Sequence, residues 1–400
     1  MKKIVLFLML TCAGTTLLHA QKNELSYSRQ NNTFSLSLNN QDGNMSLTVK
    51  GDVRLTDDDK GVQQISPQGY IEYRNKNQLL NISADRNGTL IYAINGTKKT
   101  NPATEDQPLI EECVKIMIAN GVDAGNRVKR IFAKSGSAGV LNETARFKSD
   151  YVKEIYLSYL LQNEKLSKDE MIALLNKTDQ YLTSDYYKAE LLDGVMTSFL
   201  NNEATANAYL KTVSNLKSDY YQYTTIKKLL NALQDEKQFD QVLAIVANMK
   251  SDYYQSEVLK TLLNAHTISD TKFSNVMKIA TNMNSDYYKS EIISSLLTNK
   301  TISKDRYSQT IAAMQGMKSD YYQSVILTQL IDQNVKDESE WSKLIEYAGS
   351  INSESYQSEV LMKIARTMPK GESLKKELAN AAKKIHSDYY YGKVKRMLDE

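Results

Sequence analysis

The tetrapeptide Ser-Asp-Tyr-Tyr recurs along more than half of this chain, and it constrains the possible folds more than any other sequence feature. Counted at the acidic residue, successive copies lie 33 to 35 residues apart. A fixed period near 34 is typical of stacked helical repeats. Complete copies begin at Ser184, Ser218, Ser251, Ser285, Ser319 and Ser387, with a shortened copy at Ser149 and a degenerate one at Ser353.

One repeat, Ser251–Asn284, shows what each unit is expected to form. Tyr254 and the apolar residues of 258–263 recur at helical spacing, and 273–283 carry a second apolar stripe after a polar break at 264–270. Each unit is therefore predicted to be a helical hairpin. A single hairpin cannot bury both of its faces, so the hairpins must stack. We predict an α-solenoid over residues 109–400, similar to tetratricopeptide (TPR) or HEAT arrays.

The chain before the repeats alternates with period two from Leu25 to about Lys99. Turn residues interrupt the alternation, and Asn87-Gly88 suits a tight hairpin because both residues tolerate positive φ. This pattern predicts an antiparallel meander of five or six strands with one covered face, over residues 21–99. Residues 100–108 hold two prolines and are expected to be a linker. The predicted fold class is α+β.

Residues 1–20 are typical of an export signal: Lys2-Lys3 precede an apolar run, and Ala20 suits a cleavage position. Export to the periplasm or the extracellular space is expected. A lipoprotein anchored through Cys12 is the alternative. No later run of 18 apolar residues occurs, so no membrane-spanning segment is expected in the mature chain.

Charge and cysteine content exclude several classes of protein. Removal of Lys2 and Lys3 leaves 48 basic against 47 acidic residues, which gives no reason to expect binding to nucleic acid. Cys113 is then the only cysteine, so no internal disulfide is expected. It lies on an apolar helical face, which predicts a buried thiol.

The repeated motif has a structural interpretation. Serine is a good N-cap, and an aspartate in the first turn is favoured by the helix dipole. The second tyrosine is expected to enter the apolar stripe. The predicted helix caps are Ser184, Asp185, Ser218, Asp219, Ser251, Asp252, Ser285, Asp286, Ser319, Asp320, Ser387 and Asp388.

The first tyrosine of each copy lies off the apolar stripe. It is expected either to pack between repeats or to line a binding surface, because tyrosine supplies contact area at low entropic cost. We call these residues the first-tyrosine column and treat them as a candidate binding ladder: Tyr186, Tyr220, Tyr253, Tyr287, Tyr321 and Tyr389.

No catalytic, metal or cofactor site is expected. His266 and His386 are the only histidines after the signal, too few for a histidine-based triad or zinc site. The Ser-x-x-Lys matches at Ser214 and Ser373 lack companion motifs. The run 57–59, Asp-Asp-Asp, could offer oxygen ligands to calcium, but it lacks the spacing of a calcium loop, and a solvated acidic loop is the preferred interpretation.

Two further motifs, 57–59 (Asp-Asp-Asp) and 66–70 (Ser-Pro-Gln-Gly-Tyr), accompany the repeats. Together they resemble uncharacterised exported bacterial proteins that pair a short β segment with Ser-Asp-Tyr-type helical repeats. Similar regions are appended to membrane metallopeptidases that resemble beta-lactam sensors. The peptidase unit is absent here, because the sequence has no His-Glu-x-x-His. The resemblance implies export and a repeat fold, and it implies no activity.

Three hypotheses follow. The first is a non-enzymatic exported scaffold that binds a protein or peptide along the repeat surface. The second is an envelope sensor or ligand-binding module, with the β segment or the first-tyrosine column holding a glycan or cell-wall fragment. The third, an enzyme of unfamiliar type, has no acid, base and nucleophile that the sequence brings together.

Overall fold

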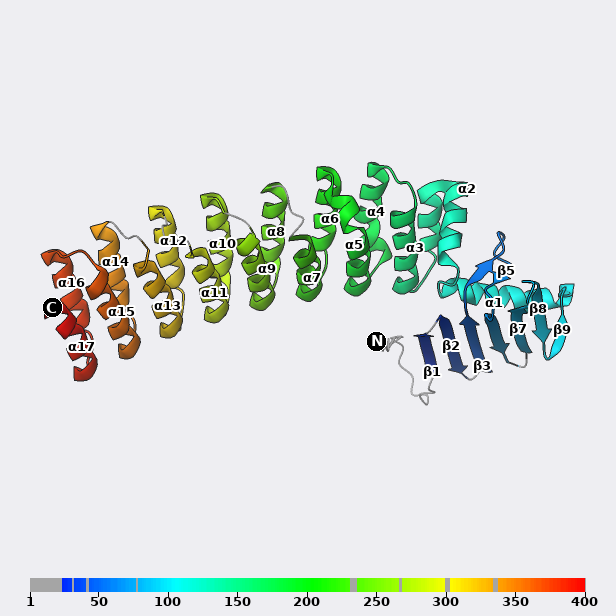
Figure 1. Ribbon diagram of the computed structural model, residues 1–400, viewed down its shortest axis with the longest axis horizontal. Helices are drawn as coiled ribbons and strands as arrows, with labels where there is room; N and C mark the ends of the chain where they lie inside the picture. Colours follow the sequence, from blue (N-terminus) through cyan, green and yellow to red (C-terminus); the bar gives the residue numbers. More distant parts are fainter. Residues whose placement is uncertain are drawn as a thin grey trace, which may run out of the picture. The chain divides into compact units, whose positions relative to one another are not determined.

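The computed structural model describes residues 24–30, 32–40, 43–76, 78–230, 236–265, 268–298, 303–333 and 337–399. The expected signal, including Cys12, and His266 lie outside the described residues. The fold is α+β, as predicted: an antiparallel sheet is followed by a long array of helices (Figure 1). The chain divides into two compact units, Met1–Ala173 with Gln180–Tyr187, and Leu174–Asp179 with Lys188–Glu400.

The described part of the first unit contains a seven-stranded antiparallel sheet in the order β1-β2-β3-β6-β7-β8-β9 and a separate β4-β5 hairpin. The meander is thus longer than the five or six strands predicted. Gly51, with φ +82°, ends β3 and separates it from β4. The strands are β1 (Glu24–Gln30), β2 (Thr33–Asn40), β3 (Gly43–Lys50), β4 (Val53–Leu55), β5 (Val62–Ile65), β6 (Tyr70–Asn75), β7 (Gln78–Ala84), β8 (Leu90–Ile94) and β9 (Thr97–Lys99).

The hairpin turns differ in detail from the prediction. The loop at Asn87-Gly88 does join β7 to β8, but it spans Asp85 to Thr89, and its positive φ is at Gly88. A two-residue turn with positive φ at both residues is formed by Asn95-Gly96, between β8 and β9. That conformation is characteristic of the tight hairpins whose twist matches the flanking strands.

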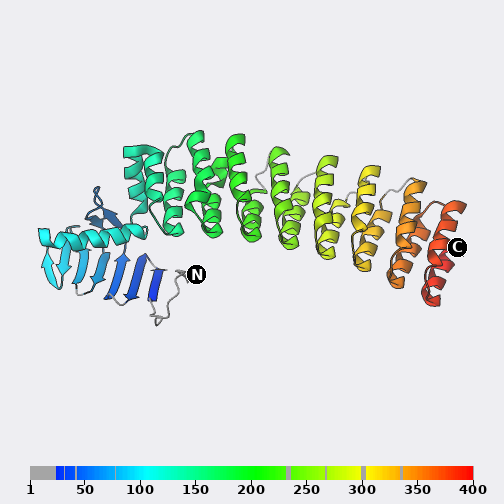
Figure 2. The same ribbon diagram turned by 180° about the vertical axis from the view of Figure 1, so that it is seen from behind.

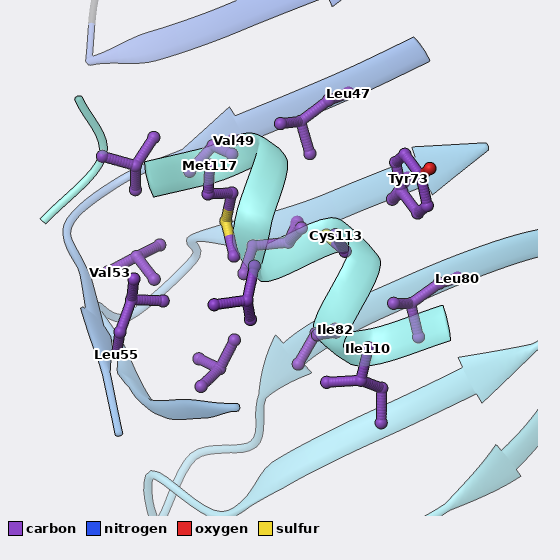
Figure 3. Close-up of a cluster of buried hydrophobic side chains, with 14 of the residues drawn as sticks. Leu47, Val49, Val53, Leu55, Tyr73, Leu80, Ile82, Ile110, Cys113 and Met117 are labelled. Atoms are coloured by element: carbon purple, nitrogen blue, oxygen red, sulfur yellow. The ribbon is translucent and has the colours of Figure 1, made fainter. Parts of the chain in front are cut away.

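Helix α1 (Gln107–Ala119) runs across the covered face of the sheet (Figures 1 and 2). Its residues Ile110, Cys113 and Met117 point toward Leu47 and Ile82 of the strands in Figure 3. Because this apolar face is needed to close the β core, α1 packs with the sheet and is not the first solenoid helix. The sequence had placed the solenoid boundary before it, at residue 109.

The segment predicted to be a linker, 100–108, is structured. It contains the short helix η1 (Thr104–Asp106) and the first residues of α1. Asp106 accepts from Lys99 Nζ at 2.7 Å and from the backbone N–H of Ala103 at 2.8 Å. These contacts hold the chain between β9 and α1 in one conformation.

The next helix, α2 (Ala124–Thr144), contains a break at Gly136, whose φ of +62° is not helical. Gly136 therefore divides α2 into two shorter helical segments. The remaining helices are α3 (Asp150–Asn163), α4 (Lys168–Tyr181), α5 (Asp185–Leu200), α6 (Glu203–Ser214), α7 (Asp219–Leu229), α8 (Glu236–Asn248), α9 (Asp252–Ala265), α10 (Asp270–Asn282), α11 (Asp286–Leu296), α12 (Lys304–Met314), α13 (Asp320–Ile331), α14 (Glu338–Ala348), α15 (Glu354–Thr367), α16 (Glu372–Ala382) and α17 (Asp388–Asp399).

The repeats are helical hairpins, as predicted. In the second unit, the first helices contact one another in the series α7, α9, α11, α13, α15 and α17, and the second helices do so from α6 to α12 and between α14 and α16. In the repeat that starts at Ser251, the second stripe is wholly buried, with Phe273 and Val276 fully inaccessible. Burying such side chains stabilises the array by about 1.5–3 kcal/mol each.

Candidate functional site

The first-tyrosine column is exposed at regular intervals. The exposed fractions of Tyr220, Tyr253, Tyr287 and Tyr321 are 49%, 45%, 46% and 50%. Each is the second residue of a first helix, directly after the aspartate that begins it. The repeat length therefore sets the interval between the tyrosines. The helices α7, α9, α11 and α13 therefore present one tyrosine per repeat along one edge of the second unit.

The second tyrosines hold this edge together. The ring of Tyr254 lies 5.0 Å from Tyr253 in its own repeat and 6.1 Å from Tyr220 in the preceding one, both in edge-to-face geometry. Tyr288 lies 4.9 Å from Tyr287 and 6.0 Å from Tyr253. The same pattern continues through Tyr322, Tyr321 and Tyr356. Edge-to-face pairs at these distances contribute about 0.5–1.5 kcal/mol beyond their buried area.

The sequence predicted that the second tyrosine enters the apolar stripe, and this is wrong. Tyr254 is only half-buried, whereas Gln255 and Ser256 behind it are buried together with Val258 and Leu259. The reason is that the second tyrosine packs between two first tyrosines, at the edge of the helix layer.

Two members of the first-tyrosine column lie at its ends. Tyr186 is half-buried in the first unit, with its ring 5.0 Å from Tyr187. Tyr389, in the last helix, is 63% exposed. The Lys393 ammonium lies 4.3 Å from the centre of the Tyr389 ring, and the hydrogen bond from Lys393 lowers the pKa of the Tyr389 phenol.

The aspartate of the motif joins consecutive repeats. Asp252 Oδ2 accepts from the backbone N–H groups of Asn284 and Ser285, the two residues before the next first helix. Asp219, Asp286 and Glu354 make the same pair of bonds to their own next repeats, and Asp320 bonds to Ser353. The sequence predicted only an interaction with the helix dipole. The inter-repeat bond was missed because it joins residues 31 to 33 positions apart.

The serine stands where an N-cap was predicted, but its hydroxyl does not do the capping. At the described starts of α11, α13 and α15, Ser285, Ser319 and Ser353 occupy the N-cap position without a capping hydrogen bond from the side chain. Their backbone N–H groups are instead bound by the aspartate or glutamate of the preceding repeat. The carboxylate therefore fixes the helix start from the neighbouring unit.

The residue after the second tyrosine has a role that sequence reasoning missed. The Gln255 amide donates to the carbonyls of Val246 and Met249, at the end of the preceding helix α8, at 3.0 Å each. Gln222 and Gln323 donate to the equivalents of the Met249 carbonyl, those of Leu216 and Met317, and Gln357 donates to the carbonyl of Gly349, just after α14. The signal was present, because glutamine or lysine follows the motif in every copy from Ser184 to Ser353.

The acidic run 57–59 belongs to an ion-pair cluster in the first unit. Asp59 receives two bonds from Arg127, at 3.0 and 2.6 Å, and one from Arg130 at 3.1 Å. The loop is therefore solvated at Asp57 and Asp58, in agreement with the preferred interpretation, whereas Asp59 is held by ion pairs to both arginines. Among the described residues, no group of three or more histidine, cysteine or acidic side chains is arranged to hold a metal ion.

Arg127 is the centre of this cluster. It is 4% exposed and donates to Asp59, to Glu143 at 3.0 Å and to the hydroxyl of Tyr156. Burial opposes its charge, but the hydrogen bonds to Asp59 and Glu143 prevail and raise the pKa of the guanidinium. Burial raises the pKa of the Tyr156 phenol to about 12. This charged arginine fixes the β4–β5 loop on α2. Because its guanidinium is engaged by these hydrogen bonds, it is not a candidate for binding a ligand or for catalysis.

The other candidate groups lie apart from the first-tyrosine column. Cys113 is buried in the β core, and its burial raises the thiol pKa to about 12. His386 is exposed, and its backbone N–H is bound by Glu354. The Ser214 hydroxyl donates to the Lys211 carbonyl. Within the described ranges, no helix is long and apolar enough to span a bilayer.

No family model matches the chain, and no curated protein matches it. One solved structure with some similarity is described as "Computational Design of Self-Assembling Cyclic Protein Homooligomers"; the match is 12% identical and covers 71% of this chain and 93% of that one. Its TM-score is 0.12, too low to support any argument. The geometry of the repeats therefore carries the functional proposal.

Proposed function

We propose that this protein is a non-enzymatic exported scaffold that binds a protein or peptide partner along the first-tyrosine column. The observation that carries the proposal is the regular exposure of Tyr220, Tyr253, Tyr287 and Tyr321, each close to half. Rigid aromatic side chains that remain accessible supply contact area to a partner at low entropic cost.

The column is held in place before any partner arrives. Tyr253 contacts the rings of Tyr254 and Tyr288, and the bonds from Asp252 to Asn284 and Ser285 tie its repeat to the next. A surface that is already ordered loses less conformational freedom on binding, which favours affinity.

The spacing of the column favours an extended ligand. Tyr220 and Tyr253 are joined through Tyr254 by centroid distances of 6.1 and 5.0 Å, so their separation cannot exceed the sum of the two. Stacked helices lie about 8–10 Å apart. An extended chain advances about 3.3 Å per residue, so roughly every third residue of a peptide could meet a tyrosine.

The test is peptide-display selection against the full-length protein, followed by affinity measurement. We expect the selected peptides to bind the double variant Tyr253→Ala/Tyr287→Ala at least about tenfold more weakly, a loss of about 1.4 kcal/mol. The control is Tyr70→Ala, which removes a tyrosine of similar exposure, 38%, from the sheet. Peptides that bind wild type and the double variant equally would refute the column as the site.

Two further measurements address the rest of the proposal. A glycan that binds saturably and is lost in the same double variant would favour the envelope-sensor alternative. Export predicts that the mature protein starts at Gln21, which mass spectrometry of the purified envelope fraction checks. A lipid-modified Cys12 at the mature N-terminus would contradict cleavage at that position.

A further inference from the structure

A second possible site lies in the first unit, away from the first-tyrosine column. A hollow of about 570 Å³ opens between the turn that follows β3, the start of α2 and one face of α3. Pockets that hold small ligands have volumes of about 300–1,000 Å³. Its floor is apolar and belongs to the β core, with Phe34, Val49 and Val122 buried beneath it.

One wall of the hollow is aromatic. Tyr151, Ile155 and Tyr159 are four residues apart on α3, so they share one face of that helix. Tyr159 is 41% exposed. Its ring lies directly on the backbone of Gly125, where an added Cβ would come within 2.6 Å of the ring. Gly125 thus sets the position of a ring that remains accessible to a ligand.

Other lining residues supply polar groups of both kinds. Asp52 offers a carboxylate that accepts hydrogen bonds, Lys129 offers an ammonium that donates, and Asn126 has an amide. All three residues are exposed, and the charges of Asp52 and Lys129 are opposite in sign. The side chain of the third charged residue of the lining, Asp123, is buried and paired with Arg130 at 3.3 Å. A ligand that suits this lining carries hydroxyls, which both donate and accept, and no net charge. With Lys129 as the only basic side chain among the lining residues, the pocket is poorly suited to a phosphate group, for which arginine clusters are preferred.

We infer that this hollow is a binding site for a neutral oligosaccharide. A sugar ring presents C–H groups on its faces and hydroxyls around its edge. Its face would pack on Tyr159, and its hydroxyls would bond with Asp52, Asn126 and Lys129. This site is separate from the first-tyrosine column and does not depend on the function proposed for it.

The test is isothermal titration calorimetry of the full-length protein with three neutral probes: chitotetraose, cellotetraose and maltotetraose. We expect saturable binding of at least one probe. Tyr159→Ala and Lys129→Ala should each lower its affinity at least about tenfold. Gly125→Ala should also lower it, because the added methyl displaces the Tyr159 ring.

Tyr70→Ala is the matched control, since Tyr70 is a similarly exposed tyrosine of the same unit outside the hollow. It should bind the probe like wild type, and circular dichroism should show that all variants keep their secondary structure. Failure of all three probes to bind at millimolar concentration would overturn the inference. Equal losses of probe affinity in Tyr70→Ala and Tyr159→Ala would also overturn it. So would the absence of sugar binding together with a selected peptide whose binding depends on Tyr159.

Discussion

Asp252 Oδ2 accepts from the backbone N–H of Asn284 at 2.8 Å and from that of Ser285 at 2.7 Å, so one carboxylate oxygen ties its repeat to the start of the next. Charge-assisted bonds to backbone N–H groups are roughly twice as strong as neutral ones. Because the contact recurs from repeat to repeat, the motif serves as a connector between hairpins.

Asp252→Ala should weaken the joint between α9 and α11. The substitution leaves two N–H groups without their acceptor, and we expect a loss of about 1.5–3 kcal/mol in the free energy of unfolding. Amide hydrogen exchange at Asn284 and Ser285 should accelerate. Asp240→Ala, at an exposed aspartate of α8, is the control and should change stability little. Unchanged exchange at both amides would contradict the connector role.

The two tyrosines of one repeat should differ in their effect on stability. Tyr254 is half-buried and contacts the rings of Tyr220, Tyr223 and Tyr253. Tyr253 is 45% exposed. In urea unfolding, Tyr254→Ala should therefore cost more than Tyr253→Ala, for which we expect less than about 1.5 kcal/mol. Equal costs would show that the first-tyrosine column serves mainly for packing.

Arg127→Met should strongly destabilise the first unit. The substitution leaves Asp59 and Glu143 without their buried partner, and breaking such a pair costs about 3–5 kcal/mol. Arg146 bonds to the same Glu143 at 3.3 Å, but its side chain is 79% exposed. Arg146→Met should therefore cost less than about 1 kcal/mol. Thermal unfolding followed by circular dichroism compares the two, and similar losses would contradict the central position of Arg127.

Alkaline pH should destabilise the β core through Cys113. Burial raises the pKa of this thiol from 9.0 to about 12 in the folded state. The stabilising effect of the neutral thiol is complete below pH 9.0 and is lost as the pH rises through about 12. Between these values, the free energy of unfolding should fall by about 1.4 kcal/mol per pH unit because of this group.

Urea unfolding of wild type and Cys113→Ala at several pH values checks this slope. The variant should be less stable at neutral pH, because a buried group is removed. The difference between the two proteins should then narrow above pH 9. Parallel curves would show that the thiol does not ionise on unfolding.

The hydrophobic pattern of the sequence was sufficient to predict the helical hairpins of the repeats and the antiparallel strands before them, but not the number of strands or the place of α1. The period near 34 and the stripes of 258–263 and 273–283 predicted hairpins, because the spacing of apolar residues must match the helix that buries them. Ser167 and Glu170 have the spacing of a capping box, and they make its reciprocal bonds. Short-range patterns of this kind depend on residues a few positions apart, so they are visible in the sequence.

Contacts between distant residues were decided only by the tertiary structure. Three contacts could not be deduced from the sequence, because each joins segments that only the fold brings together. These are the packing of α1 on the β core, the ion pair of Asp59 with Arg127 and the bond from Ser285 to Asp252. The first and second tyrosines are adjacent and chemically identical in the sequence. Packing makes one a bridge between repeats and leaves the other exposed, because adjacent positions on a helix point about 100° apart.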